Sequence, residues 1–226
     1  EGLFTIINRT QLTDRIVDLW IDCPAIAKEA MPGQFVMLGA PGYFLRRPIS
    51  ICQIDRAGGF LRLVFEIKGG GTRALAGLDV NMSVKMLGPL GRGFSVPEGK
   101  RAILIGGGIG TPPMLSLAMD TPDVTAILGF RNADAVILKE EFDAVCGDVI
   151  LCTDDGSGGE KGFVTDALQR LLGTSKPDLI CACGPIPMLR CVAQIANSHH
   201  LPAQLSLEER MACGVGACRG CGVHML

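Results

Sequence analysis

The chain has 226 residues, of which 48% are apolar and 19% are charged, and its formal net charge is -2. This length allows one large or two small domains, and the apolar fraction suffices for packed cores, which excludes a disordered chain. The charge balance argues against a nucleic-acid partner. No apolar run reaches the roughly 18 residues of a membrane-spanning helix. The first residues also lack a secretory signal, so we expect a cytoplasmic protein without a membrane segment.

Residues 1–97 show short apolar runs separated by glycine and proline turns, such as Pro32-Gly33, Pro41-Gly42 and Gly69-Gly70-Gly71. The clearest runs are residues 16–22, 34–38, 60–67 and 83–87. Short strands of near-alternating polarity at this spacing are typical of an antiparallel barrel or sandwich. We therefore predict an antiparallel β domain for residues 1–97.

From Arg101 onward, apolar runs typical of buried strands alternate with helix-like segments. The predicted strands are residues 102–105, 124–130, 149–152, 179–182 and 204–207. The predicted helices are residues 113–119, 139–144, 164–172 and 187–197. This alternation indicates an α/β domain whose five-stranded parallel sheet carries helices on both faces. We place it at residues 98–204, and a short cysteine-rich segment at residues 205–226.

Two turns of the predicted α/β domain have features of a nucleotide site. The run from Gly106 to Pro113 follows a predicted strand and opens a helix, so bare backbone N-H groups could approach a pyrophosphate. It departs from the dinucleotide fingerprint because position 111 is Thr where that pattern has Gly, and a tight turn without a ligand is the alternative. The run Cys183-Gly184-Pro185 ends another predicted strand. Both turns lie at the carboxyl edge of the sheet, where such sheets bind ligands.

The predicted β domain has two candidate phosphate-binding elements of its own. Arg47-Pro48-Ile49-Ser50 heads a strand, and Gly69-Gly70-Gly71-Thr72 precedes a short helical stretch. An Arg offers a bidentate fork to phosphate, and a glycine turn ending in Thr offers N-H and hydroxyl donors. The alternative for each is an ordinary surface residue or turn.

The order of these motifs resembles that of the ferredoxin-reductase family. The shared elements are Arg47 to Ser50, Gly71-Thr72, the Gly88-Pro89-Leu90-Gly91 turn, Gly106 to Pro112 and Cys183-Gly184-Pro185. The resemblance implies a six-stranded antiparallel FAD-binding barrel over residues 1–97, followed by the NAD-binding α/β domain.

The same resemblance implies roles for individual residues. Arg47 and Thr72 would hold the FAD pyrophosphate, Ser50 would lie near the reactive nitrogen of the flavin, and Cys183 would lie near the nicotinamide ring. Many members have Tyr where this chain has Ile49, so the usual aromatic packing on the flavin is replaced or absent. The remaining implied cofactor-binding positions are Pro48, Val64, Phe65, Glu66, Gly71, Gly107, Gly108, Thr111, Gly184 and Pro185.

The last segment contains Cys213-x4-Cys218-x2-Cys221, the spacing of plant-type [2Fe-2S] proteins. Its glycines leave N-H groups free to bond cluster sulfurs. The pattern requires a fourth Cys, so we expect either an unusual fourth ligand or one beyond the given sequence. A zinc site completed by His224 is the alternative, since three Cys and one His form an ordinary zinc set.

The run from Ser206 to Cys218 resembles the electron transfer subunits of NAD-dependent, type B dihydroorotate dehydrogenases. This resemblance implies a partner, an FMN-containing catalytic subunit that oxidises dihydroorotate in pyrimidine biosynthesis, with two copies of each chain in a heterotetramer. Electrons would pass singly to the [2Fe-2S] cluster, then to FAD, and as a hydride to NAD⁺.

Two other functions remain open at this point. One is the small FAD and [2Fe-2S] subunit of a ferredoxin-dependent NADP reductase or sulfide dehydrogenase. Arg131 could then bind the 2′-phosphate of NADP, although we expect NAD. The other is a regulatory, nucleotide-sensing or zinc-stabilised binding module without turnover. Such a module would be colourless, whereas the dihydroorotate dehydrogenase subunit and the reductase or sulfide dehydrogenase subunit would both contain flavin.

Overall fold

The computed structural model describes residues 1–223 of the chain. It divides into two compact units, one formed by residues 1–93 with the described residues from 209 onward, and one formed by residues 94–208. No helix in the described part is long and apolar enough to span a membrane. The binding of FAD, NAD and a cluster by residues 1–97, 98–204 and 205–226, respectively, stays a prediction.

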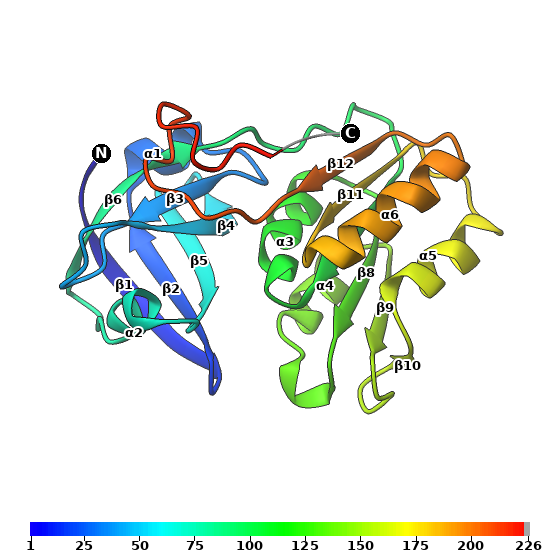
Figure 1. Ribbon diagram of the computed structural model, residues 1–226, viewed down its shortest axis with the longest axis horizontal. Helices are drawn as coiled ribbons and strands as arrows, with labels where there is room; N and C mark the ends of the chain where they lie inside the picture. Colours follow the sequence, from blue (N-terminus) through cyan, green and yellow to red (C-terminus); the bar gives the residue numbers. More distant parts are fainter. Residues whose placement is uncertain (224–226) are drawn as a thin grey trace. The chain divides into compact units, whose positions relative to one another are not determined.

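The first unit contains a closed barrel of six antiparallel strands in the order β1-β2-β5-β4-β3-β6, which confirms the predicted six-stranded barrel (Figure 1). The alternating polarity of its strands explains why they close around a core. In the segment 16–22, for example, Val17, Leu19 and Ile21 are fully buried. The strands are β1 (Gly2–Thr13), β2 (Ile16–Asp22), β3 (Phe35–Leu38), β4 (Arg47–Asp55), β5 (Phe60–Glu66) and β6 (Ser83–Leu90).

Two short helices accompany the barrel, α1 (Pro24–Glu29) and α2 (Gly70–Ala76). The run Gly88-Pro89-Leu90-Gly91, predicted as a turn, is instead largely the end of β6. The strand continues through a cis Gly88-Pro89 bond to Leu90, which pairs with Phe35 of β3. The prediction of a turn was wrong because Pro89 and Gly88 lie at the end of a strand, where Pro removes little hydrogen bonding.

The second unit contains a parallel sheet of six strands in the order β10-β9-β8-β7-β11-β12. Five of them correspond to the five predicted strands. The sixth strand, β10, consists of two polar residues and pairs only with β9, so the sequence has no apolar run that could predict it. The strands are β7 (Ala102–Gly107), β8 (Thr125–Phe130), β9 (Asp148–Thr153), β10 (Glu160–Lys161), β11 (Leu179–Cys183) and β12 (Ala203–Ser206). The sheet thus runs two residues beyond the predicted boundary at residue 204.

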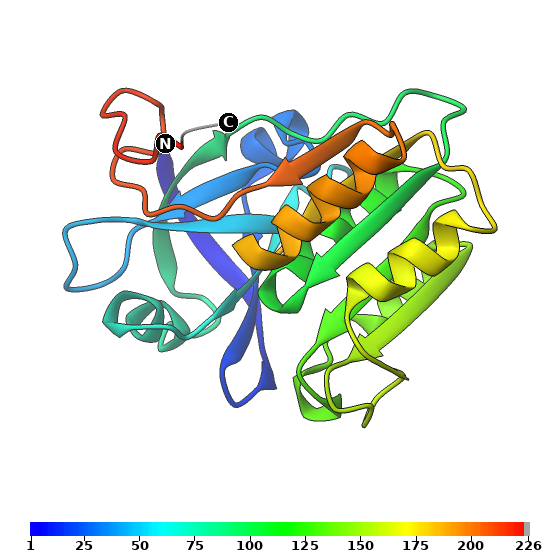
Figure 2. The same ribbon diagram turned by 45° about the vertical axis from the view of Figure 1, so that its right-hand side comes forward.

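Helices cover both faces of this sheet, as predicted. Helices α5 and α6 lie on the face seen in front in Figure 2, and α3 and α4 lie on the other. On the α5 and α6 side, Leu168 and Val192 pack against Ile103 and Ile105 of β7. The helices are α3 (Thr111–Asp120), α4 (Lys139–Val145), α5 (Val164–Leu172) and α6 (Ile186–Ser198), with 3-10 turns η1 (Gly108–Gly110) and η2 (Ala133–Ala135).

Candidate functional site

The two predicted nucleotide turns of the sheet unit meet at the carboxyl edge of neighbouring strands. Cys183, the last residue of β11, pairs with Gly106 of β7. A methyl group on Gly110 would overlap the carbonyl oxygen of Cys183 and lie 2.6 Å from the backbone nitrogen of Gly184. Gly184 itself has φ +157, which a glycine adopts readily. The glycines thus allow two backbone turns to touch, leaving no room for a side chain between them.

Thr111, at the first position of α3, lies beneath this turn. Its side chain is fully buried, and its hydroxyl has no hydrogen-bond partner within the described residues. A methyl group on Gly106 would lie 2.8 Å from this hydroxyl oxygen. A buried hydroxyl without a partner costs free energy. Thr111 therefore has an unpartnered hydroxyl donor next to the predicted dinucleotide turn.

Cys183 is 3% exposed at the same place. Burial raises the pKa of its thiol to about 11, against a lowering by a hydrogen bond with Ser206. The thiol is therefore protonated at neutral pH. It is a buried, neutral group that cannot act as a thiolate nucleophile there.

The barrel elements also converge. Arg47, at the start of β4, lies so close to Gly71 of α2 that a methyl group on Gly71 would overlap the guanidinium. Its Nη1 donates to the carbonyl oxygen of Leu45 at 2.6 Å. The ring of Tyr43 lies 5.2 Å from its Cζ, within cation-π range. The structure thus brings together Arg47 and the glycine turn that the sequence placed 22 residues apart.

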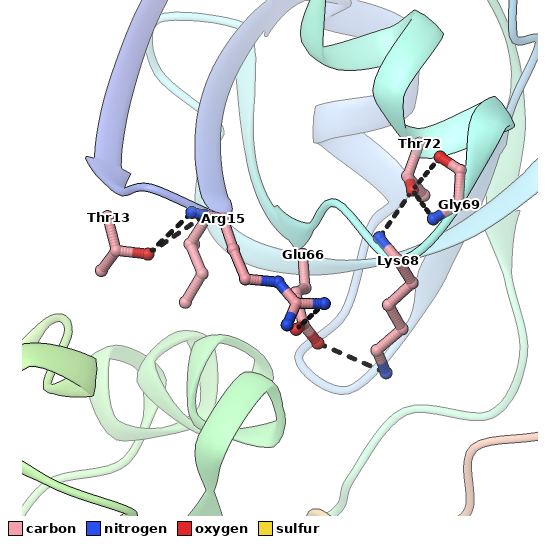
Figure 3. A network of polar contacts seen from close by, with 7 residues as sticks. Thr13, Arg15, Glu66, Lys68, Gly69 and Thr72 are labelled. Atoms are coloured by element: carbon pink, nitrogen blue, oxygen red, sulfur yellow. Dashed lines mark hydrogen bonds and ion pairs between the residues drawn. The ribbon is translucent and has the colours of Figure 1, made fainter.

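The Thr72 hydroxyl shapes the turn (Figure 3). It accepts hydrogen bonds from the backbone nitrogens of Lys68 at 2.9 Å and Gly69 at 3.1 Å, and it donates to the Gly69 carbonyl oxygen at 3.1 Å. The hydroxyl is thus already used in holding the loop.

An ion-pair network ties this loop to the rest of the barrel. Glu66, the last residue of β5, pairs with Arg15 at 3.2 Å and with Lys68 at 3.8 Å, as Figure 3 shows. The backbone nitrogen of Arg15 in turn donates to the Thr13 hydroxyl at 3.3 Å. The carboxylate of Glu66, a predicted flavin position, is therefore paired with two exposed cations just before the glycine turn.

The other predicted flavin positions lie on β4 and β5. Ser50 and Pro48 are half-buried, whereas Ile49 belongs to the buried core of the barrel. Val64 and Phe65 are also buried. What Ile49, Val64 and Phe65 could offer a ligand is therefore mainly their backbone, because their side chains are packed against protein.

The cysteine segment brings two of its three thiols close together. The backbone nitrogen of Cys218 donates to Cys213 Sγ at 3.5 Å. Hydrogen bonds from the N-H groups of Cys218 and Val215 lower the pKa of Cys213 to about 6. Among residues 1–223, no three His, Cys, Asp or Glu side chains are gathered in a geometry that could hold a metal ion. Cys221 is half-buried, and His224 of the zinc alternative lies outside the described residues.

Two residues at these sites were not anticipated from sequence. Tyr43 lies against Arg47, and Met188 of α6 fills the space beside Gly107 and Gly184. Tyr43 is the one tyrosine in the chain and lies four residues before Arg47, which is a weak signal. Met188 lies on an amphipathic helix, where a methionine ordinarily indicates core packing.

Comparisons with known proteins cover nearly the whole chain. A family model described as "Oxidoreductase NAD-binding domain" matches residues 104–194. The electron transfer subunit of dihydroorotate dehydrogenase B (NAD(+)) of Bacillus caldolyticus is 39% identical over 231 residues, covering 98% of this chain and 88% of that protein. The protein of the same name from Listeria monocytogenes serotype 4b is 40% identical, covering 96% of this chain and 86% of that protein.

Solved structures give the same picture of the fold. The structure titled "Insights into flavin-based electron bifurcation via the NADH-dependent reduced ferredoxin-NADP oxidoreductase structure" is 29% identical, with a TM-score of 0.88 over 98% of this chain and 82% of that chain. A ferredoxin NADP+ reductase from Neisseria gonorrhoeae with bound FAD and NADP is 16% identical, with a TM-score of 0.74 over 91% of this chain and 98% of that chain. At that identity the second similarity concerns the fold.

Proposed function

The chain belongs to the family of electron transfer subunits of dihydroorotate dehydrogenase B (NAD(+)), and from this premise we propose that it carries electrons from a catalytic subunit to NAD⁺ in pyrimidine biosynthesis. The observation that carries the proposal is the 39% identity with such a subunit over 98% of this chain. The thiol spacing Cys213-x4-Cys218-x2-Cys221 supports it. As an oxidoreductase subunit, the chain works with a partner.

The barrel residues fit an FAD diphosphate. The hydrogen bonds of Arg47 within residues 1–223 go to the carbonyl oxygens of Leu45 and Arg46, so no carboxylate there neutralises its charge. The bare backbone of Gly71 lies directly beside it. We assign Arg47 and the Gly71-Thr72 backbone to the diphosphate and Ser50 to the flavin, with Pro48, Ile49, Val64, Phe65 and Glu66 forming the surrounding wall.

The sheet unit fits a nicotinamide dinucleotide. The unpartnered buried hydroxyl of Thr111 is a donor that a ligand at the turn could satisfy. No atom lies within 4 Å of the position that a Cβ on Gly108 would take, and this open space suits a close approach of the backbone to phosphate. We therefore assign Gly107, Gly108 and Thr111 to NAD, with Cys183, Gly184 and Pro185 facing the nicotinamide.

The cysteine segment supplies the donors for a [2Fe-2S] cluster. Cys213, Cys218 and Cys221 would be three of its ligands, and the lowered pKa of Cys213 favours the thiolate that such a cluster needs. A cluster carries one electron, a flavin exchanges one or two and NAD⁺ accepts a hydride, so bound FAD would connect the other two carriers. The chain's own residues bind and orient these groups.

We propose that the partner is an FMN-containing dihydroorotate dehydrogenase catalytic subunit and that two copies of each chain form a heterotetramer. The relatives' name, electron transfer subunit, supports a catalytic partner. A cytoplasmic location is part of the proposal. All ten cysteines, which lie in the described part of the chain, are free thiols, as is usual in a reducing compartment.

The test is the visible absorption spectrum of the chain purified without oxygen together with its co-purifying partner. Flavin and iron-sulfur bands that bleach with dihydroorotate and also with NADH are expected. Bleaching by NADH alone would leave an NADH-linked flavoprotein but contradict the proposed substrate. A colourless protein would contradict the whole proposal.

A pair of cysteine variants tests the ligand assignment. Cys218→Ser should abolish the iron-sulfur bands while flavin remains bound. Cys191→Ser is the matched control, because Cys191 is an exposed thiol on α6, away from the cysteine segment in sequence. Equal cluster absorbance in the two variants would remove Cys218 from the ligand set.

One observation favours a second candidate, a subunit of a ferredoxin-NADP oxidoreductase. The structure of such an enzyme matches this chain with a TM-score of 0.88 at 29% identity. The name of that enzyme includes NADH as well as NADP, but only NADP requires a cation for its 2′-phosphate, and Arg131 follows β8 as an exposed residue. Faster flavin reduction by NADPH than by NADH, lost in Arg131→Ala, would favour the second candidate.

A further inference from the structure

The loop between β3 and β4 contains two aromatic residues in very different positions. Phe44 is 100% exposed. Its neighbour Tyr43 is 46% exposed, because its ring lies 5.2 Å from Cζ of Arg47 and its hydroxyl occupies the place that a Cβ on Gly70 would take. One aromatic of the pair is thus held against the glycine turn, while the other extends into solvent.

The two glycines of α2 each make room for one planar group. Gly70 lies under the hydroxyl of Tyr43, and Gly71 lies under the guanidinium of Arg47. A Cβ at either position would displace the group above it. Arg47 is therefore bounded by bare backbone and by the ring of Tyr43, while its Nη1 is tied to the carbonyl oxygen of Leu45.

We infer that Tyr43 is a positioning residue that holds the Arg47 guanidinium in place for the diphosphate of FAD, an inference that rests on the flavin site proposed above. A long arginine side chain loses rotamer freedom when it binds an anion. Stacking on Tyr43 restricts that freedom before the anion arrives, so less is lost on binding. The ring also leaves the charge intact, whereas a carboxylate in its place would compete with phosphate.

The test is the affinity of the full-length flavin-free chain for added FAD, followed by quenching of flavin fluorescence. Tyr43→Leu should raise the Kd about fivefold, which corresponds to about 1 kcal/mol. Tyr43→Phe keeps the ring face and should stay within about twofold of the original chain. Phe44→Leu, the matched control, should leave the Kd unchanged. If Phe and Leu at position 43 weaken binding equally, the ring is not the operative group and the inference is overturned.

A double variant separates positioning from direct binding. Arg47→Ala should raise the Kd about tenfold to a hundredfold, because a charge-assisted contact is lost. If Tyr43 acts through Arg47, adding Tyr43→Leu to Arg47→Ala should cause no further loss. A further fivefold loss would show that Tyr43 binds FAD independently, which would overturn the positioning role.

Gly70→Ala perturbs the same contact from the other side and serves if Tyr43→Leu does not fold. The added methyl should displace the Tyr43 hydroxyl and reproduce the fivefold loss, whereas an unchanged Kd would overturn the inference. An original chain that binds no FAD would contradict the proposed flavin site itself. FAD binding that is indifferent to position 43 would overturn only the role of Tyr43.

Discussion

The glycine turn of the barrel and the glycine turn of the sheet look alike in sequence, but different groups occupy the space that a Cβ would take in each. At Gly70 and Gly71 the vacated space is filled by the ends of two side chains, Tyr43 and Arg47. At Gly110 the space is filled by the backbone of the Cys183-Gly184 turn. A side-chain end can swing aside, whereas backbone inside a parallel sheet cannot. The barrel turn thus has the positive charge of Arg47 beside it, whereas the sheet turn is bounded by rigid backbone.

The largest effect is expected where backbone meets backbone. In Gly110→Ala, the new methyl would lie 2.5 Å from the carbonyl carbon of Cys183, and neither turn can retreat. We expect a loss of about 3 kcal/mol in the free energy of unfolding, measured by urea denaturation. Gly147→Ala is the control, since its methyl would lie 3.8 Å from the nearest atom, the Val124 carbonyl oxygen. Equal losses in the two variants would contradict the proposed rigidity of the sheet turn.

The second effect is the pH dependence of the buried thiol in the sheet turn. The pKa of Cys183 rises from 9.0 to about 11 on folding, so the native state retains a proton that the unfolded chain releases between these values. Stability from this group is complete below pH 9 and is lost as the pH rises towards 11, at about 1.4 kcal/mol per pH unit. Burial also raises the pKa of Cys23, Cys146, Cys152 and Cys181, so the loss of stability in the original chain is steeper than this. In urea denaturation at pH 8, 9 and 10, Cys183→Ala should lose less stability than the original chain, and the difference is the contribution of Cys183. An identical slope in the variant would contradict the assignment to Cys183.

The third effect separates affinity from stability in the barrel turn. Gly71→Ala should raise the Kd for FAD about tenfold, because the methyl displaces the Arg47 guanidinium. The free energy of unfolding without flavin should change by less than about 1 kcal/mol, since the higher helix propensity of Ala offsets the clash with a flexible side chain. Gly69→Ala, with no atom near the added methyl, should leave the Kd unchanged. A large stability loss in Gly71→Ala would show that the barrel turn is as rigid as the sheet turn, which would contradict the proposed difference between the two turns.

The smallest effect concerns Thr111. Replacing it by Val removes a buried hydroxyl that has no partner within the described residues, so stability without ligand should stay level or rise by up to about 1 kcal/mol. Affinity for NADH should fall about fivefold if the hydroxyl donates to the dinucleotide. Thr111→Ser retains the hydroxyl and should bind like the original chain. Weaker stability together with unchanged NADH affinity in Thr111→Val would show that the hydroxyl serves the fold.

Segments with a strong internal pattern could be predicted from the sequence. The predicted strand 16–22 and helix 164–172 coincide with β2 and α5, because alternating and helical periodicity are properties of the local sequence. The two-residue β10 has no such pattern and forms only because the loop after β9 folds back beside it. The turn predicted at residues 88–91 is mostly strand for a similar reason, since β3 extends the pairing of β6 to Leu90.

The candidate residues were also anticipated unequally. Glycine, arginine and cysteine motifs carry a chemical requirement in their spacing, so Arg47, Gly71, Thr111 and the three cysteines of the last segment could be named in advance. The use of the Thr72 hydroxyl within its own loop could not, because it depends on where the Lys68 and Gly69 nitrogens point. The same holds for Tyr43, whose contact with Arg47 depends on the course of a loop.

Periodicity along the chain was enough to predict an antiparallel β domain followed by a parallel sheet, and the motifs carried the family resemblance that implied a barrel, because both kinds of signal are local in the sequence. The protonation states and hydrogen-bond partners of the candidate residues followed only from the three-dimensional fold. Burial raises the pKa of Cys183 to about 11, while hydrogen bonds from backbone N-H groups lower the pKa of Cys213 to about 6. The physical reason is that pKa values and hydrogen-bond partners depend on neighbours in space, many of which lie far away along the chain.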